Sequence, residues 1–63
     1  MIKKLHINDE FVNNELIKMC EIVKINHNKV LVDVGYEKTW CSISHAIEII
    51  NINKWRLKDK EDR

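Results

Sequence analysis

The sequence has no proline, one glycine, four aromatic residues and a formal net charge of only +1. The near-neutral charge excludes both an overall basic field that would attract nucleic acid and an acidic field that would imitate it, so electrostatic recognition must rest on local patches. The chain is instead rich in Ile, Asn and Lys, which are residues of AT-rich codons. We therefore expect a small gene of an AT-rich bacterium or its phage.

Long apolar runs are also missing. No stretch approaches the roughly 20 apolar residues that a membrane-spanning helix needs, and residues 1–4 are not followed by the apolar segment of a signal peptide. We therefore expect a cytoplasmic protein with no membrane partner. Cys20 and Cys41 fit a reducing compartment as free thiols rather than as a disulfide.

The short chain limits what the protein can enclose. With 63 residues it holds one domain, which buries a modest share of its surface and has a thin stability margin. Because catalytic pockets are usually concave and preformed, such a domain is more suited to offering a surface. We therefore predict a non-enzymatic binding module over residues 1–53, followed by a charged tail over residues 54–63.

Catalytic and metal-binding patterns are absent as well. Cys41 and His45 are four residues apart, but no third group orients them as a nucleophile and a base. Structural zinc sites use tight pairs such as C-x2-C, and no such pair occurs. The remaining ligand-type residues are scattered as Cys20, His6 and His27. We therefore predict no catalytic residues, no metal and no cofactor.

The clearest local pattern is a β-hairpin. The β-rich run 21–25 is followed by a polar turn over residues 26–29 and by a second run over residues 30–34, in which Val30, Val32 and Val34 alternate. Two β-branched runs joined by an Asn-containing tetrapeptide are typical of a hairpin.

After the hairpin we expect a turn at Gly35, which takes positive φ freely, and a third strand over residues 39–43. Ser44 is placed to cap a single helical turn over residues 44–47. The apolar run 48–52 is then expected to form the last strand.

The N-terminal third is ambiguous. Residues 2–7 have the composition of a first strand. Val12, Leu16 and Met19 fall at helical spacing, so residues 9–19 could form a helix. However, Asn13 and Asn14 favour a turn, so strand and loop is the alternative interpretation of the same segment.

The predicted fold class is mostly β, a small SH3-like barrel of about five strands with a single helical turn before the last strand. Ile22 and Ile25 cannot both face inward in a regular strand, so a bulge near Val23 is expected. The predicted core consists of Ile22, Val23, Ile25, Val30, Val32, Val34, Cys41, Ile43, Ile47 and Ile49.

Three segments resemble KOW-type and related SH3-like modules: residues 20–25, 28–35 and 44–49, with residues 6–11 similar to the family's "G-D-x-V" opening. The sequence departs from the family at Cys20 and Asn8, where glycine is usual. The resemblance implies a binding function. KOW-type modules often bind RNA, ribosomes or RNA polymerase, and SH3-like modules at large bind peptides, proteins or nucleic acid.

The candidate binding residues are aromatic and basic. Trp40 is expected on the strand face opposite Cys41 and Ile43, where it would serve as a stacking platform or as an anchor for a partner. Alternatively, Trp55 folds back and covers Trp40. The lysines suit phosphate contacts, although a solvated charged surface is the competing interpretation. The predicted site comprises Trp40, Tyr36, Trp55, Lys24, Lys29, Lys38 and Arg56.

Two functions are consistent with these patterns. The first is association with nucleic acid, or with a protein of the transcription or translation machinery. The second is a protein-interaction module, such as a phage-encoded modulator of a host protein or a small homodimer. The salt dependence of binding separates them, because phosphate-driven binding weakens steeply with salt.

Overall fold

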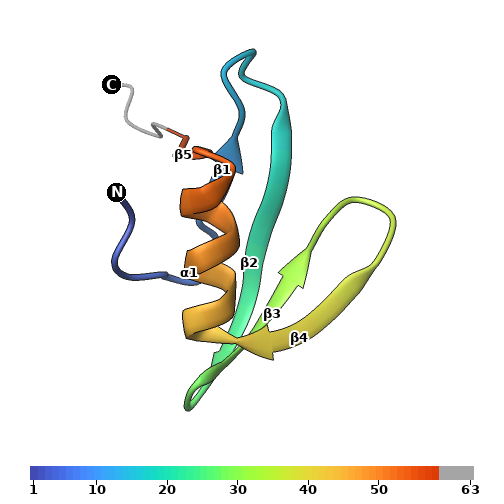
Figure 1. The fold of residues 1–63 in the computed structure, drawn as a ribbon. Helices are drawn as coiled ribbons and strands as arrows, with labels where there is room; N and C mark the ends of the chain where they lie inside the picture. Colours follow the sequence, from blue (N-terminus) through green and yellow to red (C-terminus); the bar gives the residue numbers. More distant parts are fainter. Residues whose placement is uncertain (59–63) are drawn as a thin grey trace.

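A computed structural model describes residues 1–58 of the chain. The chain order is β1 (Glu10–Val12), β2 (Lys18–Asn26), β3 (Lys29–Asp33), β4 (Lys38–Ser42), α1 (Ile43–Ile52) and β5 (Arg56–Leu57). The strands form one antiparallel sheet in the order β4-β3-β2-β1-β5, and α1 lies across it (Figure 1). The predicted mostly-β class with about five strands is confirmed, but the sheet is open between β4 and β5 and does not close into the predicted barrel.

The β2–β3 hairpin has the predicted form. Its two-residue turn contains His27 with a φ of 57°, and Asn26 pairs with Lys29 beside it. The register shifts between Ile22 and Lys24, which confirms the bulge expected near Val23. Because the bulge adds a residue, both Ile22 and Ile25 face the core side, opposite Val32 and Val30.

The core lies between the concave side of the sheet and α1. Its buried apolar residues are Leu5, Phe11, Val12, Cys20, Ile22, Val30, Val32, Ala46 and Ile50. Of the predicted core, Ile22, Val30 and Val32 are fully part of it.

The other predicted core residues are less buried. Ile25, Val34, Cys41, Ile43 and Ile47 are partly buried and pack against the core cluster. Val23 is half-buried at the bulge. The assignment of Ile49 to the core is wrong, since 38% of its surface is exposed. The error follows from treating residues 48–52 as a strand, which gives the wrong inward-facing positions.

The helix α1 replaces both the predicted single turn at 44–47 and the predicted strand at 48–52. Ala46 and Ile50, four residues apart, are its buried positions, and Ile43 and Ile47 pack beside them. This i, i+3, i+4, i+7 spacing places all four on the side facing the sheet. The N-cap is Ser42 rather than Ser44, because the Ser42 Oγ accepts the His45 N–H at 3.1 Å. The helix therefore begins earlier than expected.

The N-terminal segment is not the first strand. Residues 2–7 form no strand, and the main chain of Ile2 is instead held by the Asn51 side chain, which accepts the Ile2 N–H at 2.9 Å and donates to the Ile2 carbonyl at 3.0 Å. This bidentate contact ties the segment to α1 and places Leu5 in the core.

Residues 9–19 form strand and loop, and the helix alternative is wrong. After β1, the Asn13 side chain accepts the backbone N–H groups of Glu15 and Ile17, at 2.8 and 3.0 Å. Leu16 takes a φ of 64° in this turn. The Asn13 carboxamide thus stabilises a tight turn in competition with a helix, as Asn side chains commonly do.

The C-terminal strand joins the sheet through β1, with Phe11 opposite Leu57 and Val12 opposite Arg56. The predicted boundary between residues 53 and 54 falls just before it. Residues 59–63, which include Lys60 and the rest of the predicted charged tail, lie outside the described residues. Within residues 1–58, no helix has the length and apolarity needed to cross a membrane.

Candidate functional site

The convex side of the β2–β3–β4 meander carries most of the predicted site residues. Lys24 on β2 pairs with Leu31 on β3, and Leu31 pairs with Trp40 on β4. Directly paired residues of antiparallel strands point to the same face, so these three side chains form one row across the meander. Neighbouring residues point the other way, and Ile22, Val30 and Val32 are buried there.

Two further rows flank the central one. Lys29 lies between Asn26 and Ser42, and Lys38 lies at the end of the row that runs through Asp33 to Glu21. We define the outer face as Lys24, Lys29, Leu31, Lys38 and Trp40. Its three lysines are exposed.

The lysines of the outer face and the acidic residues beside them differ in whether they have bonding partners. None of the ion pairs found within residues 1–58 involves Lys24, Lys29 or Lys38. The two acidic neighbours have partners of their own. Glu21 accepts a hydrogen bond from Lys18 Nζ at 2.6 Å, which raises the pKa of Lys18, and Asp33 accepts the Gly35 N–H at 2.8 Å. The lysine ammonium groups are therefore available to an anion.

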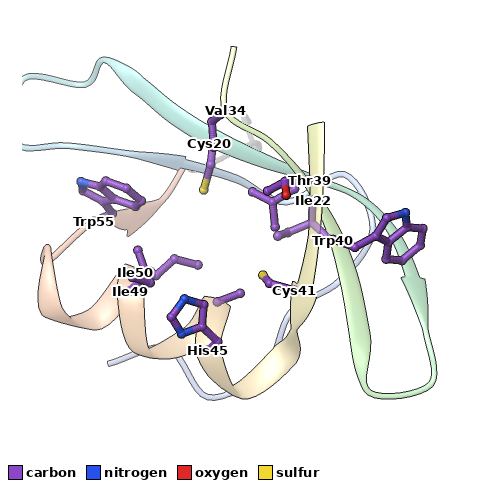
Figure 2. A pocket seen from close by; sticks show the side chains of 12 residues that line it. Cys20, Ile22, Val34, Thr39, Trp40, Cys41, His45, Ile49, Ile50 and Trp55 are labelled. Atoms are coloured by element: carbon purple, nitrogen blue, oxygen red, sulfur yellow. The ribbon is translucent and has the colours of Figure 1, made fainter. Parts of the chain in front are cut away.

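Trp40 supplies an aromatic surface beside these lysines. Its side chain is 48% exposed, and its ring points to the side of β4 opposite Cys41 (Figure 2). Leu31, half-buried, is its cross-strand neighbour. Trp55 does not cover Trp40, because Trp55 lies near the C-terminal end of α1 and the Trp40 ring lies on the far side of β4 (Figure 2). Trp40 thus has the exposure that stacking requires.

The structure separates the remaining predicted residues. Tyr36 is 86% exposed on the β3–β4 loop, which returns the chain to Lys38 at the rim of the outer face. Trp55 packs against the core behind α1, and Arg56 lies on β5 at the opposite end of the sheet. Arg56 therefore lies away from the outer face, and Trp55 lines the groove on the other side of the sheet, which Trp40 only borders.

A second feature is an apolar groove on the concave side, between α1 and the meander (Figure 2). Its volume is about 330 Å³. We define the groove by Cys20, Thr39, Cys41, His45, Ile49 and Trp55, which line it together with Val34, Trp40 and core residues. The ring of Trp40 points away from the other lining side chains (Figure 2). Sequence reasoning missed the groove, because a helix over residues 43–52 is needed to form one wall. The apolar spacing of Ile43, Ala46, Ile47 and Ile50 is the pattern that would have indicated that helix.

The two thiols in the groove are poor nucleophiles. Burial raises the pKa of Cys20 to about 11, and burial also raises the pKa of Cys41. Both thiols are therefore protonated at neutral pH, whereas the nucleophile is the thiolate. Over residues 1–58, no three His, Cys, Asp or Glu side chains lie together as a metal site would require. The groove is consequently suited to apolar contacts rather than to nucleophilic or metal chemistry.

No protein-family model, curated protein or solved structure matches the chain. The functional interpretation therefore rests on the geometry of the outer face and of the groove.

Proposed function

We propose that the protein is a non-enzymatic cytoplasmic binding module that associates with single-stranded nucleic acid, alone or within the transcription or translation machinery. The observation that carries the proposal is the central row of the outer face, in which an exposed Trp40 and an exposed Lys24 flank Leu31. Lys29 and Lys38 extend the positive charge to either side. No catalytic chemistry is part of this function.

The chemistry of the outer face suits a strand whose bases are unpaired. An exposed indole stacks on any base, and lysines neutralise phosphates without reading sequence. Because the net charge of the whole chain is only +1, binding depends on this local arrangement. We therefore expect modest affinity, little sequence preference and a strong salt dependence.

The KOW-type resemblance is part of the same proposal. Its support is the chain order: a first strand, a three-strand meander, a helical segment and a short last strand that pairs with β1. Its elements differ from the expected ones: β1 and β5 take the places of strands expected over residues 2–7 and 48–52, the helical segment has ten residues instead of a single turn, and the sheet is open. The ligand itself is inferred from the outer face.

The alternative function is protein interaction, including modulation of a host protein. The groove favours it, because apolar surface that a monomer leaves open is a common site of association. Its expected behaviour differs from that of the outer face: binding through the groove resists salt, and binding through the lysines does not.

Fluorescence anisotropy with labelled single-stranded RNA and DNA, measured over a series of increasing salt concentrations, tests the proposal. We compare Lys24→Ala/Lys29→Ala with the matched pair Lys3→Ala/Lys4→Ala, which removes the same charge from exposed positions outside the outer face. The plot of the logarithm of the binding constant against the logarithm of the salt concentration has a negative slope. The first pair is expected to make that slope less steep by about 0.7 for each phosphate that is no longer neutralised. Equal effects of the two pairs, or no binding by the wild type, would refute the proposal.

A further inference from the structure

The strand β4 forms one margin of the open sheet (Figure 1). Within residues 1–58 it pairs with β3 alone, so one row of its backbone N–H and C=O groups faces away from the sheet. Natural edge strands are commonly blunted by lysine, by proline, by bulges or by a covering loop. Residues 38–42 contain no proline, their pairing with β3 shows no register shift, and their one lysine, Lys38, is the first residue of the strand. The edge is thus a regular template for another strand.

The groove lies directly beneath this edge. Thr39 and Cys41 of β4 form one wall, and Ile49 of α1 lies opposite them. A strand added at β4 would form hydrogen bonds with the free backbone groups and would also cover apolar surface on the groove side. The free edge and the groove therefore both favour pairing of a further strand with β4.

We propose that β4 pairs antiparallel with β4 of a second copy of the chain, with the two-fold axis at Trp40. Trp40 is the midpoint of the five-residue strand, so an axis there is the register that pairs all five residues. In this register Trp40 faces Trp40 of the second copy, Lys38 faces Ser42, and Thr39 faces Cys41. A two-fold interface of this kind is self-complementary and closes at two subunits.

The side chains are compatible with this register on both faces. On the outer face the central rows join into one band, in which two Leu31–Trp40 pairs meet and a Lys24 stands at each end. Cross-strand aromatic pairs stabilise sheets, and like charges placed directly opposite destabilise them. Here Lys38 meets a serine, and Thr39 and Cys41 carry no charge. The net charge of +1 per copy adds little repulsion.

The dimer would also join two outer faces side by side, which doubles the lysines and stacking rings on one surface. The pairing itself does not rest on nucleic-acid binding, because its evidence is the free edge, the groove and the register. It is therefore tested in buffer free of nucleic acid, where failure of the proposed function has no influence on the result.

Sedimentation equilibrium of the full chain gives the test. The wild type is expected to approach twice the monomer mass of 7.6 kDa as its concentration rises. Trp40→Lys and Trp40→Glu each place like charges across the axis and remove the aromatic pair, so each variant is expected to associate at least about tenfold more weakly. An equimolar mixture of the two variants is expected to recover a dimer, because lysine then faces glutamate.

The mixing experiment is specific to the register, since only a residue at the axis faces its own copy. Tyr36→Lys is the matched control, because it adds the same charge at an exposed aromatic on the neighbouring loop, and it should leave association unchanged. Circular dichroism of each variant establishes that the monomer stays folded. A wild type that remains monomeric, a Trp40→Lys protein that still dimerises, or a mixture that stays monomeric would each overturn the proposal.

Discussion

The two faces of the β2–β3–β4 meander are built from the same three strands and differ in the burial and the chemistry of their side chains. On the concave face, Ile22, Val30 and Val32 are buried beneath α1. On the convex face, Lys24 and Trp40 are exposed on either side of Leu31. Because side chains alternate between the two faces of a strand, every second residue can stabilise the core and the residues between them can contact a ligand. Substitutions on the two faces should accordingly have separable effects.

The largest contrast is expected between Val32→Asp and Leu31→Asp, adjacent positions on opposite faces. Val32 is buried, so a carboxylate there has no partner, and we expect a decrease of at least about 3 kcal/mol in the free energy of unfolding. Because a domain of this size is only marginally stable, the variant should be unfolded. Leu31→Asp should fold and melt cooperatively by circular dichroism. Equal stabilities would reverse the assignment of the two faces.

The helix offers a second contrast, between Ile50→Ala and Ile52→Ala. Ile50 is 1% exposed and Ile52 is 68% exposed. Deleting a buried isoleucine side chain typically costs about 2–5 kcal/mol, whereas an exposed one costs little. Urea denaturation of both variants measures the difference. If residues 48–52 were instead a strand, Ile50 and Ile52 would share a face and the two decreases in stability would be similar.

The hairpin is predictable from sequence, and the reason is local. Val30, Val32 and Val34 alternate without interruption, and the Asn-containing turn leaves one register for the pairing. The bulge at Val23 follows from a simple conflict, since two isoleucines three apart cannot both face inward without an extra residue. The outer-face row of Lys24, Leu31 and Trp40 is the direct consequence of this register.

The helix is not predictable by the same reasoning. Residues 47–52 contain four isoleucines, whose β-branched side chains favour strands. Their helical conformation depends on the Ser42 cap and on burial of Ala46 and Ile50 against the sheet, and tertiary burial outweighs intrinsic propensity. Likewise Leu5 is buried in a segment held by contacts remote in the chain: Asn51 hydrogen-bonds to Ile2, 49 positions away, and the Asn8 N–H donates to the Ile22 carbonyl.

The two tryptophans allow the next test of the comparison. Trp55 packs against the core, whereas the ring of Trp40 points away from it. Trp55→Ala is therefore expected to reduce the free energy of unfolding by about 2 kcal/mol or more. Trp40→Ala should cost less than about 1 kcal/mol in stability and about 1–2 kcal/mol in nucleic-acid binding. Thermal melts and anisotropy titrations measure the two quantities. A severe decrease in the stability of Trp40→Ala would show that Trp40 belongs to the core.

The buried thiol of Cys20 gives the concave face a pH dependence. Its pKa is about 11 in the folded protein because of burial, against an ordinary value of 9.0. Stability that depends on the protonated thiol is fully present below the ordinary pKa of 9.0 and is lost as the pH rises through about 11. We therefore expect the melting temperature of the wild type to fall more steeply across this pH interval than that of Cys20→Ala. Parallel pH profiles would contradict burial of this thiol.

The smallest effect is expected at the junction of β4 and α1, where the chain leaves the sheet edge. The Ser42 Oγ accepts the His45 N–H at 3.1 Å, while the hydroxyl of the exposed Ser44 shares a hydrogen bond with the Ser42 Oγ at 3.4 Å. Replacing an N-cap serine by alanine typically costs about 1 kcal/mol. Ser42→Ala should therefore lower the free energy of unfolding by about that amount, and Ser44→Ala by less than about 0.5 kcal/mol. Urea denaturation of the two variants decides between the two caps. A larger decrease in the free energy of unfolding for Ser44→Ala would show that Ser44 is the N-cap, as the sequence pattern predicts.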